Sequence, residues 1–492
     1  MALFIFKRIV VVGTLGLTLS LAAGCSAPSV HSTMLPIAGA QPHVVALSER
    51  TSERSGRVLI HGVGFGDRRG RAHVEIGGVR APVTRWSDTL IAAYVPSSAP
   101  LGRATLRVFT RGGAQSNAAQ LAVAPAFRNA VRIAGANGNR VQWRFKADAD
   151  YIQNRPAVGP DGTIYAIDVQ GHLYALSPTG SLKWVFNASG TGFGNVSVGT
   201  DGTVYTGSTS SIFALAPDGT LKWTFAQNPS AFILLGPNVG PDGNIYAVAT
   251  QGMGVFSLAP QGTLRWMTTE NYDRPIVGLQ EVVFAPGLRS RLYFHANRHV
   301  RGLGLDGRQL FTLADGLSTL QGDPQPAVGR DGSLYTNLFS APDDPSLGRL
   351  NEEGNLRWRT LNQSNVLTTP EVGPDGVIYD ARNLSTLYAL NPDATVRWQY
   401  TDSGILLSHM PSPRNRRLLV GGIVTYGQPV FFEAVSTSGH ALWKLILPVE
   451  NGLNIVPMSR ARFASDGTTA YIGTSIAGQS SNSYCYLYSV RT

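Results

Sequence analysis

A pattern of roughly 44 residues recurs along most of this chain, and it constrains the fold more than any other feature of the sequence. Each copy begins with a tight turn such as Pro-Asp-Gly, continues through short apolar runs and a second Gly turn, and ends at a Trp, as in VGPDGTIYAIDVQGHLYALSPTGSLKW (158–184). Short apolar runs between such turns are typical of antiparallel strands. Later copies end at Trp223, Trp266, Phe311, Trp358, Trp398 and Trp443.

The two ends of the repeat region predict a closed ring. The last copy, FASDGTTAYIGTSIAGQSSNSYCYLYSV (463–490), lacks its Trp segment, and the first segment, NRVQWRF (139–145), is a Trp segment with nothing before it. Together they make one unit, so residues 139–492 hold eight units, each of the length of a four-stranded propeller blade. Pairing 139–145 as the outer strand of the final blade removes two exposed strand edges. We therefore predict an all-β chain with an eight-bladed β-propeller closed by its own N-terminal strand.

The connections within each unit predict two different faces. The turns between strands one and two and between strands three and four are short hairpins, and alternation places them on one face of the ring, here called the regular face. The remaining connections lie on the opposite, irregular face and vary in length, as in 187–195, 226–238 and 267–280. Variable loops on a rigid scaffold often carry recognition, so we expect a partner to bind the irregular face.

The repeat pattern DGTIYAIDVQGHLYAL followed by Gly and LKW (161–184) resembles the PQQ-like, quinoprotein-type β-propeller repeat, and the resemblance extends over 139–492. That family includes eight-bladed quinoprotein dehydrogenases and a non-catalytic lipoprotein that assists outer-membrane assembly. The resemblance implies the fold. It leaves the function open, because propellers host many activities.

Residues 42–125 predict a smaller β domain. Its short strands are separated by Gly and Pro, and it resembles the IPT/TIG domain, an immunoglobulin-like β-sandwich, in IHGVGFG (60–66), VEIGGVRA (74–81), WSDTLIAAYVP (86–96) and GGAQSN (112–117). Membership implies a spacer or an interaction platform. We interpret Trp86 as core packing in preference to a ligand contact. Residues 126–138 are expected to be a linker.

The N-terminus predicts export and a lipid anchor. Lys7 and Arg8 precede an apolar run that is typical of a signal-peptide core and short for a membrane span. LAAGC (21–25) resembles the lipobox of bacterial lipoproteins, which implies cleavage after residue 24 and acylation of Cys25; an ordinary secretory signal is the alternative. Residues 25–41 are then a flexible tether. Ser26 implies, by the same resemblance, the outer membrane, with the side left open.

Charge and cysteine content argue against several functions. The net charge is +10, but the densest basic stretch, PRNRRLL (413–419), is short and lacks interleaved aromatic residues, so we expect no nucleic-acid partner. The chain has two cysteines, Cys25 and Cys485. The adjacent cysteines of quinoprotein enzymes and the haem motif C-x-x-C-H are both missing, so we predict no cofactor.

Two small clusters were considered as metal sites. His295 and His299 are four residues apart but fall in a strand region and lack the Glu of a zinc protease. Asp343 and Asp344 lie in a long loop, where a solvated loop is preferred to a calcium site. We assign no metal site and no catalytic residue.

Two hypotheses of function follow. The first is a non-catalytic, lipid-anchored scaffold of the cell envelope, whose irregular propeller face binds a protein or glycan partner. The alternative is an envelope enzyme with its site at the propeller axis, either a quinone-dependent oxidoreductase or a polysaccharide-processing enzyme. Scattered catalytic groups from several blades remain compatible with the sequence, and the sequence does not determine the oligomeric state.

Overall fold

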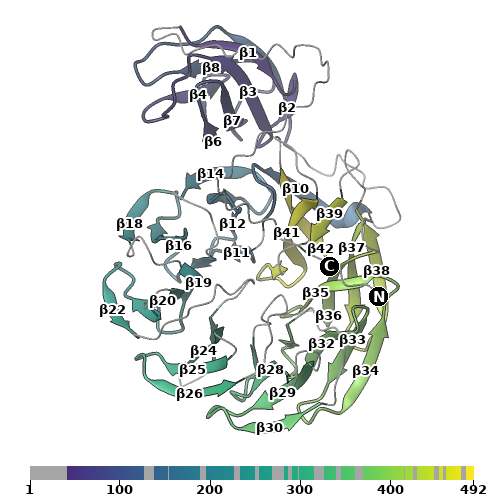
Figure 1. The fold of residues 1–492 in the computed structure, drawn as a ribbon. Helices are drawn as coiled ribbons and strands as arrows, with labels where there is room; N and C mark the ends of the chain where they lie inside the picture. Colours follow the sequence, from purple (N-terminus) through teal and green to yellow (C-terminus); the bar gives the residue numbers. More distant parts are fainter. Residues whose placement is uncertain are drawn as a thin grey trace, which may run out of the picture. The chain divides into compact units, whose positions relative to one another are not determined.

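The computed structural model describes residues 41–126, 138–152, 154–188, 195–226, 233–249, 254–268, 282–285, 291–296, 299–314, 326–339, 345–360, 369–414, 416–424, 429–447, 454–457, 461–477 and 484–492. Within these ranges the regular structure is β-strand, apart from one short 3-10 turn, η1 (Gly138–Arg140). The expected all-β fold is confirmed, and Figure 1 shows a sandwich domain and a ring of small sheets.

The first domain is a sandwich of two sheets. One sheet has the order β1-β3-β7-β6, with bounds β1 (His43–Leu47), β3 (Arg57–Val63), β7 (Leu90–Tyr94) and β6 (Val83–Trp86). The other has the order β2-β9-β8-β4-β5, with bounds β2 (Thr51–Glu53), β9 (Ala119–Ala124), β8 (Gly102–Phe109), β4 (His73–Ile76) and β5 (Val79–Ala81). Inward positions such as Ile60, Ile91 and Leu106 fill the core between the sheets. Trp86 packs against this core, as expected, and its Nε1 donates to the Gly66 carbonyl.

Eight sheets form the ring, numbered here as blades 1 to 8 in chain order. Blade 1 comprises β11 (Ala157–Val158), β12 (Ile164–Ile167), β13 (His172–Leu176) and β14 (Leu182–Asn187). Blade 2 comprises β15 (Val196–Val198), β16 (Val204–Gly207), β17 (Ser211–Leu215) and β18 (Leu221–Ala226). Blade 3 comprises β19 (Ile233–Val239), β20 (Ile245–Ala249), β21 (Val255–Leu258) and β22 (Leu264–Met267). Blade 4 comprises β23 (Val283–Phe284), β24 (Arg291–Ala296), β25 (His299–Gly304) and β26 (Gln309–Ala314).

The second half of the ring repeats this arrangement. Blade 5 comprises β27 (Ala327–Val328), β28 (Leu334–Phe339), β29 (Pro345–Leu350) and β30 (Leu356–Arg359). Blade 6 comprises β31 (Glu371–Val372), β32 (Ile378–Arg382), β33 (Thr386–Leu390) and β34 (Val396–Thr401). Blade 7 comprises β35 (Ile405–Pro411), β36 (Arg417–Ile423), β37 (Val430–Ser436) and β38 (Ala441–Ile446).

Blade 8 closes the ring with strands from both ends of the repeat region. It comprises β39 (Asn454–Pro457), β40 (Arg462–Phe463), β41 (Thr469–Ala477), β42 (Cys485–Arg491) and β10 (Val141–Ala147). Strand β10 pairs antiparallel with β42, from Val141 opposite Val490 to Ala147 opposite Cys485. The predicted closure by the N-terminal strand of the repeat region is therefore confirmed. Because β10 pairs with β42, the edge of β42 is not left exposed.

An acidic turn shapes the regular face of most blades. In blade 1, Asp161 Oδ1 accepts a hydrogen bond from the Thr163 backbone N–H and its Oδ2 accepts one from the Thr163 hydroxyl. The same contacts join Asp201 to Thr203. Because Asp and Gly favour this local geometry, the DG pairs at 161, 201, 242, 331, 375 and 466 lie in the hairpin between the first two strands of their blades, and those at 218 and 306 lie between the third and fourth strands.

The repeated Trp joins six of the eight blades to the next one by a hydrogen bond. The indole Nε1 donates to a carbonyl in the next blade's turn between strands three and four, in the pairs Trp143–Pro178, Trp184–Pro217, Trp223–Pro260, Trp266–Leu305, Trp358–Pro392 and Trp398–Thr437. The turn glycine lies against the indole ring: a Cβ on Gly180 would lie 2.6 Å from Trp143. The Trp positions are therefore contacts between blades, as the sequence predicts.

Candidate functional site

The most elaborate polar network in the described part of the chain lies between the sandwich and the propeller. Arg57 Nη1, from β3, donates to Asp148 Oδ1, just after β10, over 2.6 Å. Thr84 Oγ1, from β6, donates to Asp148 Oδ2, and Arg85 Nη2 lies 3.6 Å from Asp148 Oδ1. Asp148 is fully buried, and these groups from the sandwich compensate its charge.

Tyr94 inserts an aromatic ring from the sandwich into the core of the propeller. Its ring stacks on Phe145 of β10 with centroids 5.3 Å apart and meets Tyr174 of β13 edge-on at 5.9 Å. Its hydroxyl donates to the Lys146 carbonyl. The side chain belongs to the same buried cluster as Trp143 and Leu176, so Tyr94 fills the space between blade 8 and blade 1.

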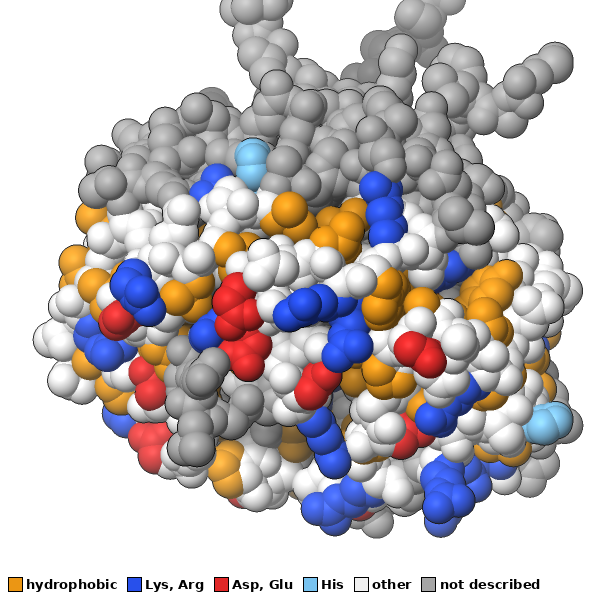
Figure 2. Space-filling model, turned by 90° about the horizontal axis from the view of Figure 1, so that it is seen from below, with side chains coloured by type: hydrophobic (Ala, Val, Ile, Leu, Met, Phe, Trp, Pro, Cys, Tyr) orange, Lys and Arg blue, Asp and Glu red, His pale blue; other side chains and the backbone are white. Residues whose placement is uncertain are grey.

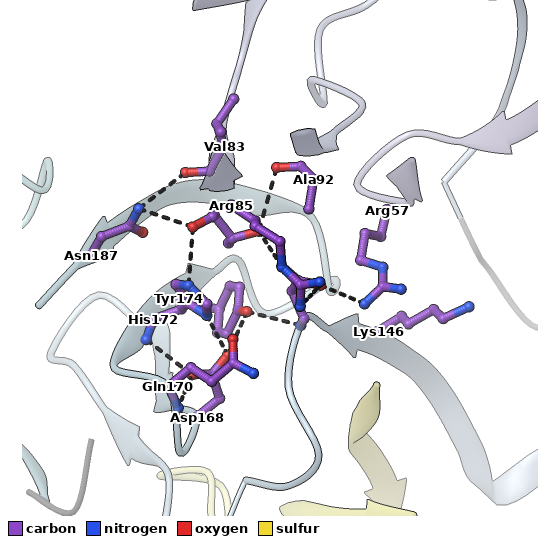
Figure 3. A network of polar contacts seen from close by, with 12 residues as sticks. Arg57, Val83, Arg85, Ala92, Lys146, Asp168, Gln170, His172, Tyr174 and Asn187 are labelled. Atoms are coloured by element: carbon purple, nitrogen blue, oxygen red, sulfur yellow. Dashed lines mark hydrogen bonds and ion pairs between the residues drawn. The ribbon is translucent and has the colours of Figure 1, made fainter. Parts of the chain in front are cut away.

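His172 connects blade 1 to the sandwich through two acceptors. Its Nδ1 lies 2.8 Å from Asp168 Oδ2, and its Nε2 lies 3.1 Å from the Thr84 carbonyl (Figure 3). Burial alone lowers the pKa of His172, but the hydrogen bond and charge of Asp168, with the charge of Asp148 and the Thr84 carbonyl, outweigh it and raise that pKa. Both ring nitrogens face acceptors, which is the arrangement that a protonated imidazole satisfies.

The sandwich contacts the outer strand of blade 1 at both of its ends. Ser55 Oγ accepts from the Leu182 N–H at the start of β14, and Asn187 at its end donates to the Val83 and Thr84 carbonyls. Leu182 is 3% exposed, whereas the equivalent Leu221 of blade 2 is 47% exposed. The family resemblance implied a spacer or a platform, and the contacts show a sandwich docked on blades 8 and 1.

A second buried polar cluster lies between blades 6 and 7. Tyr400 donates to Glu433 Oε1 over 2.5 Å, and Lys444 Nζ contacts both carboxylate oxygens of Asp402 at 2.6 and 2.7 Å. Burial, followed by the charge of Asp402, raises the pKa of Glu433 to about 7 against the lowering by Tyr400 and Lys444. Glu433 therefore titrates near neutrality, but its partners are all parts of the blade-to-blade contact.

The residues singled out in the sequence are mostly separate from these clusters. Cys25 and the pair Asp343 and Asp344 lie outside the described residues, as do 189–194, 227–232 and 269–280 of the expected loops, and 233–238 belongs to strand β19. His295 is on β24, as expected for a strand, and His299 begins β25. Cys485 is buried, and burial raises the pKa of its thiol well above the usual value.

Two further features are absent from the described residues. No group of three or more His, Cys, Asp or Glu side chains there could hold a metal ion. No helix in the same ranges is long and apolar enough to cross a membrane.

The sequence contained a usable signal for the docked blade. Asp168 and His172 occur together in blade 1; blades 2 and 3, in VYTGS (204–208) and IYAVA (245–249), lack the aspartate, and blade 4 has only the histidine, His299. The combination of Asp and His breaks the repeat and therefore marks the blade that contacts the sandwich.

Comparison with known proteins agrees with these two domains. A family model described as the IPT/TIG domain matches residues 42–123, and one described as outer membrane protein assembly factor BamB matches residues 128–286. No curated protein matches the sequence. The chain therefore contains a TIG domain and a BamB-like propeller domain.

Solved structures with low sequence identity share the propeller fold. BamB from Moraxella catarrhalis matches with a TM-score of 0.53 and 15% identity, covering 71% of this chain and 98% of that one. The Dos1 propeller matches with a TM-score of 0.51 and 10% identity, covering 71% and 94%. The quinohemoprotein alcohol dehydrogenase ADHIIG from Pseudomonas putida HK5 matches with a TM-score of 0.50 and 12% identity, covering 74% and 78%. At these identities the likeness concerns the fold, which accommodates both binding proteins and enzymes.

Proposed function

We propose that this protein is a non-catalytic scaffold of the cell envelope, anchored by lipid on Cys25 in the outer membrane, and that its irregular propeller face binds a protein partner. The observation that carries the proposal is the docking of the TIG sandwich on blades 8 and 1, which makes one body of the two domains. The BamB-like repeat region supports a role in assembly or scaffolding.

The contact between the sandwich and the propeller favours a rigid binding scaffold in preference to two domains that move about a hinge. The buried pair of Arg57 and Asp148 and the inserted Tyr94 fix the sandwich to the closing strand of the ring. A rigid body loses little conformational entropy when it binds a partner, which favours affinity. The irregular connections of blades 2 to 7 then supply the variable contacts, because loops on a rigid scaffold vary without disturbing its core.

The anchor complements this arrangement. LAAGC (21–25) provides the acylation signal, and the segment 25–41 is long enough to separate the body from the membrane surface as a tether. Several acyl chains on Cys25 give firm membrane attachment, since one chain alone binds only marginally.

Site-specific crosslinking in the native membrane tests the proposal. A photo-reactive amino acid is placed at Ser210 or Ser385, in described connections of the irregular face, and at the exposed Asp218 or Asp393 of the regular face as matched controls. We expect a defined protein adduct from the irregular positions and none from the controls, identified by mass spectrometry. The Cys25→Ala variant is expected to lose the adduct together with membrane attachment.

Other outcomes separate the alternatives. Equal adducts from both faces contradict recognition by the irregular face. Adducts to glycan in place of protein identify the partner as a polysaccharide. No adduct from either face, together with quinone binding or turnover by the purified protein, supports the enzyme hypothesis and overturns the scaffold.

A further inference from the structure

The Trp at the end of blade 7 lacks the partner that its counterparts have. Trp443 is 6% exposed, and its Nε1 is buried without a hydrogen-bond partner among the described residues. In blade 6 the equivalent Trp398 donates to Thr437 of the next blade's hairpin. Buried N–H groups are almost always paired, because an unpaired one costs about 1–3 kcal/mol.

The ring closure explains why the usual acceptor is missing. Blade 8 has no hairpin between its third and fourth strands, because β42 and β10 come from opposite ends of the repeat region. By register, Thr492 corresponds to Pro178, which accepts from Trp143. The N–H and Oγ1 of Thr492 both donate to the Thr468 carbonyl, alongside β41, and Trp443 Nε1 makes no hydrogen bond to Thr492.

One arginine covers this indole, and two more lie within electrostatic range of that arginine. The Arg140 guanidinium lies over the Trp443 ring, with Cζ 4.8 Å from the centroid. Burial and the positive charges of Arg417 and Arg491 lower the pKa of Arg140, so the three charges are within electrostatic range of one another. None of the three has a carboxylate partner in the described part of the chain. We call Arg140, Arg417, Trp443 and Arg491 the closure site.

Four other blades pair a basic side chain of the regular face with an aspartate. Ion pairs join a turn aspartate to a basic residue in Asp161–Lys183, Asp201–Lys222, Asp242–Arg265 and Asp331–Arg349. In blade 7 the corresponding turn is PRNRR (413–417), which has no acid. Asp466 of blade 8 is near Arg414, and its carboxylate already accepts from Thr468. Positive charge is therefore left uncompensated at this point of the ring.

We propose that the closure site binds a phosphate group, which accepts the Trp443 Nε1 hydrogen bond and pairs with Arg140, Arg417 and Arg491. Guanidinium groups match the geometry of phosphate oxygens, and the indole N–H is a donor only. Arg140 and Arg417 are half-buried and Arg491 is exposed, whereas the Trp443 Nε1 is buried beneath them, so a phosphate must displace the Arg140 side chain from the ring to reach it. The phosphate is either free or part of a lipid headgroup. This function is separate from partner binding on the irregular face.

The test follows the indole N–H signals of the full-length protein by nuclear magnetic resonance during titration with inorganic phosphate. The signal that disappears in Trp443→Phe is assigned to Trp443, and the one that disappears in Trp398→Phe is the internal control. We expect phosphate to shift the Trp443 signal and leave the Trp398 signal in place. Sodium chloride at matched ionic strength is expected to leave both in place.

Arginine variants test phosphate binding while Trp443 is kept, so the result does not depend on the Trp substitution. Arg140→Gln and Arg417→Gln are each expected to weaken phosphate binding about tenfold, through loss of a charge-assisted hydrogen bond. Arg308→Gln, an exposed arginine on the regular face of blade 4, is the matched control and is expected to bind as the parent protein does. Circular dichroism melting confirms that each variant is folded.

Soluble lipids distinguish the two sources of phosphate. Dihexanoyl phosphatidylglycerol below its micelle concentration replaces inorganic phosphate in the same titration, with dihexanoyl phosphatidylcholine as the zwitterionic control. Tighter binding of the glycerol lipid than of inorganic phosphate assigns the site to a headgroup, and the reverse assigns it to free phosphate. The proposal is overturned if neither shifts the Trp443 signal, or if Arg140→Gln, Arg417→Gln and Arg308→Gln all bind phosphate equally.

Discussion

Arg57 Nη1 of the sandwich and Asp148 Oδ1 of the propeller are 2.6 Å apart, and both side chains are buried, with exposures of 5% and 0%. A charge pair that is removed from water stabilises the protein only while both partners are present, because either one alone is a buried unpaired charge. The two domains therefore share stability through this contact.

We predict that Arg57→Ala lowers the free energy of unfolding by about 3–5 kcal/mol, because it leaves the Asp148 carboxylate buried with only Thr84 and the more distant Arg85. Urea denaturation measures the change. Lys183→Ala, which breaks the exposed pair with Asp161, is the matched control and is expected to cost less than about 1 kcal/mol. Equal losses in the two variants would contradict a shared buried contact.

Glu433 is expected to make stability depend on pH. Its pKa is about 7 in the folded protein against 4.5 for the unconstrained side chain, so the folded state binds the extra proton between these values. The contribution to stability is complete below about pH 4.5 and is lost as pH rises through 7, a change of about 3 kcal/mol.

Glu433→Gln tests this pH dependence. The amide oxygen still accepts from Tyr400, and the variant removes the titrating group while Asp402 and Lys444 remain paired. We expect the variant to be more stable than the parent protein at pH 8 and nearly equal at pH 4.5, in urea denaturation across this range. A parallel pH profile for the two proteins would show that Glu433 does not titrate in this window.

The propeller could be predicted from the sequence because its causes are local. The DG pairs of the described residues each lie in a hairpin, each Trp has the same place in its unit, and NRVQWRF (139–145) is the strand that the last unit lacks. The docking of the sandwich has no such signal. Arg57 and Asp148 are 91 residues apart, and Tyr94 occurs in an ordinary strand sequence, so only the folded chain brings them together.

Phe311 replaces the repeated Trp in blade 4, and Arg291 supplies the missing donor. Phe311 packs against Gly354 of blade 5 as the other indoles pack on their turn glycines. The carbonyl of Glu352, which corresponds to Pro178, accepts from Arg291 Nη1 instead of an indole, and Arg291 Nη2 lies 3.3 Å from Glu352 Oε2. The blade contact thus keeps its hydrogen bond by another route.

A double-mutant cycle tests this substitution of donors. Arg291→Ala is expected to cost about 1–3 kcal/mol, because the Glu352 carbonyl loses its charged donor. Adding Phe311→Trp to Arg291→Ala is expected to recover about 1 kcal/mol, whereas Phe311→Trp alone gives no gain because the carbonyl is already occupied. Thermal or urea unfolding of the four proteins measures the coupling, and additive effects would refute the exchange of donors.

Gly180 is held against Trp143, where blade 8 meets blade 1. Its φ is +83°, and a Cβ would lie 2.6 Å from the indole Cγ. Gly376 has a φ of +80° with no atom within 4 Å of its Cβ position, so it provides a control with the same backbone conformation and no contact. Alanine is strained in this region of φ at either position, by about 1 kcal/mol.

We therefore predict that Gly180→Ala destabilises the protein more than Gly376→Ala, by a further 1–3 kcal/mol or so, because the added methyl group must displace the Trp143 ring. Urea denaturation of both variants isolates the contact between blades, since the backbone strain cancels in the difference. Fluorescence of the indoles is expected to change in Gly180→Ala and not in Gly376→Ala. If the two variants lose the same stability, the Trp143 ring moves aside at no cost, and the blade contact at the closing strand is looser than its geometry implies.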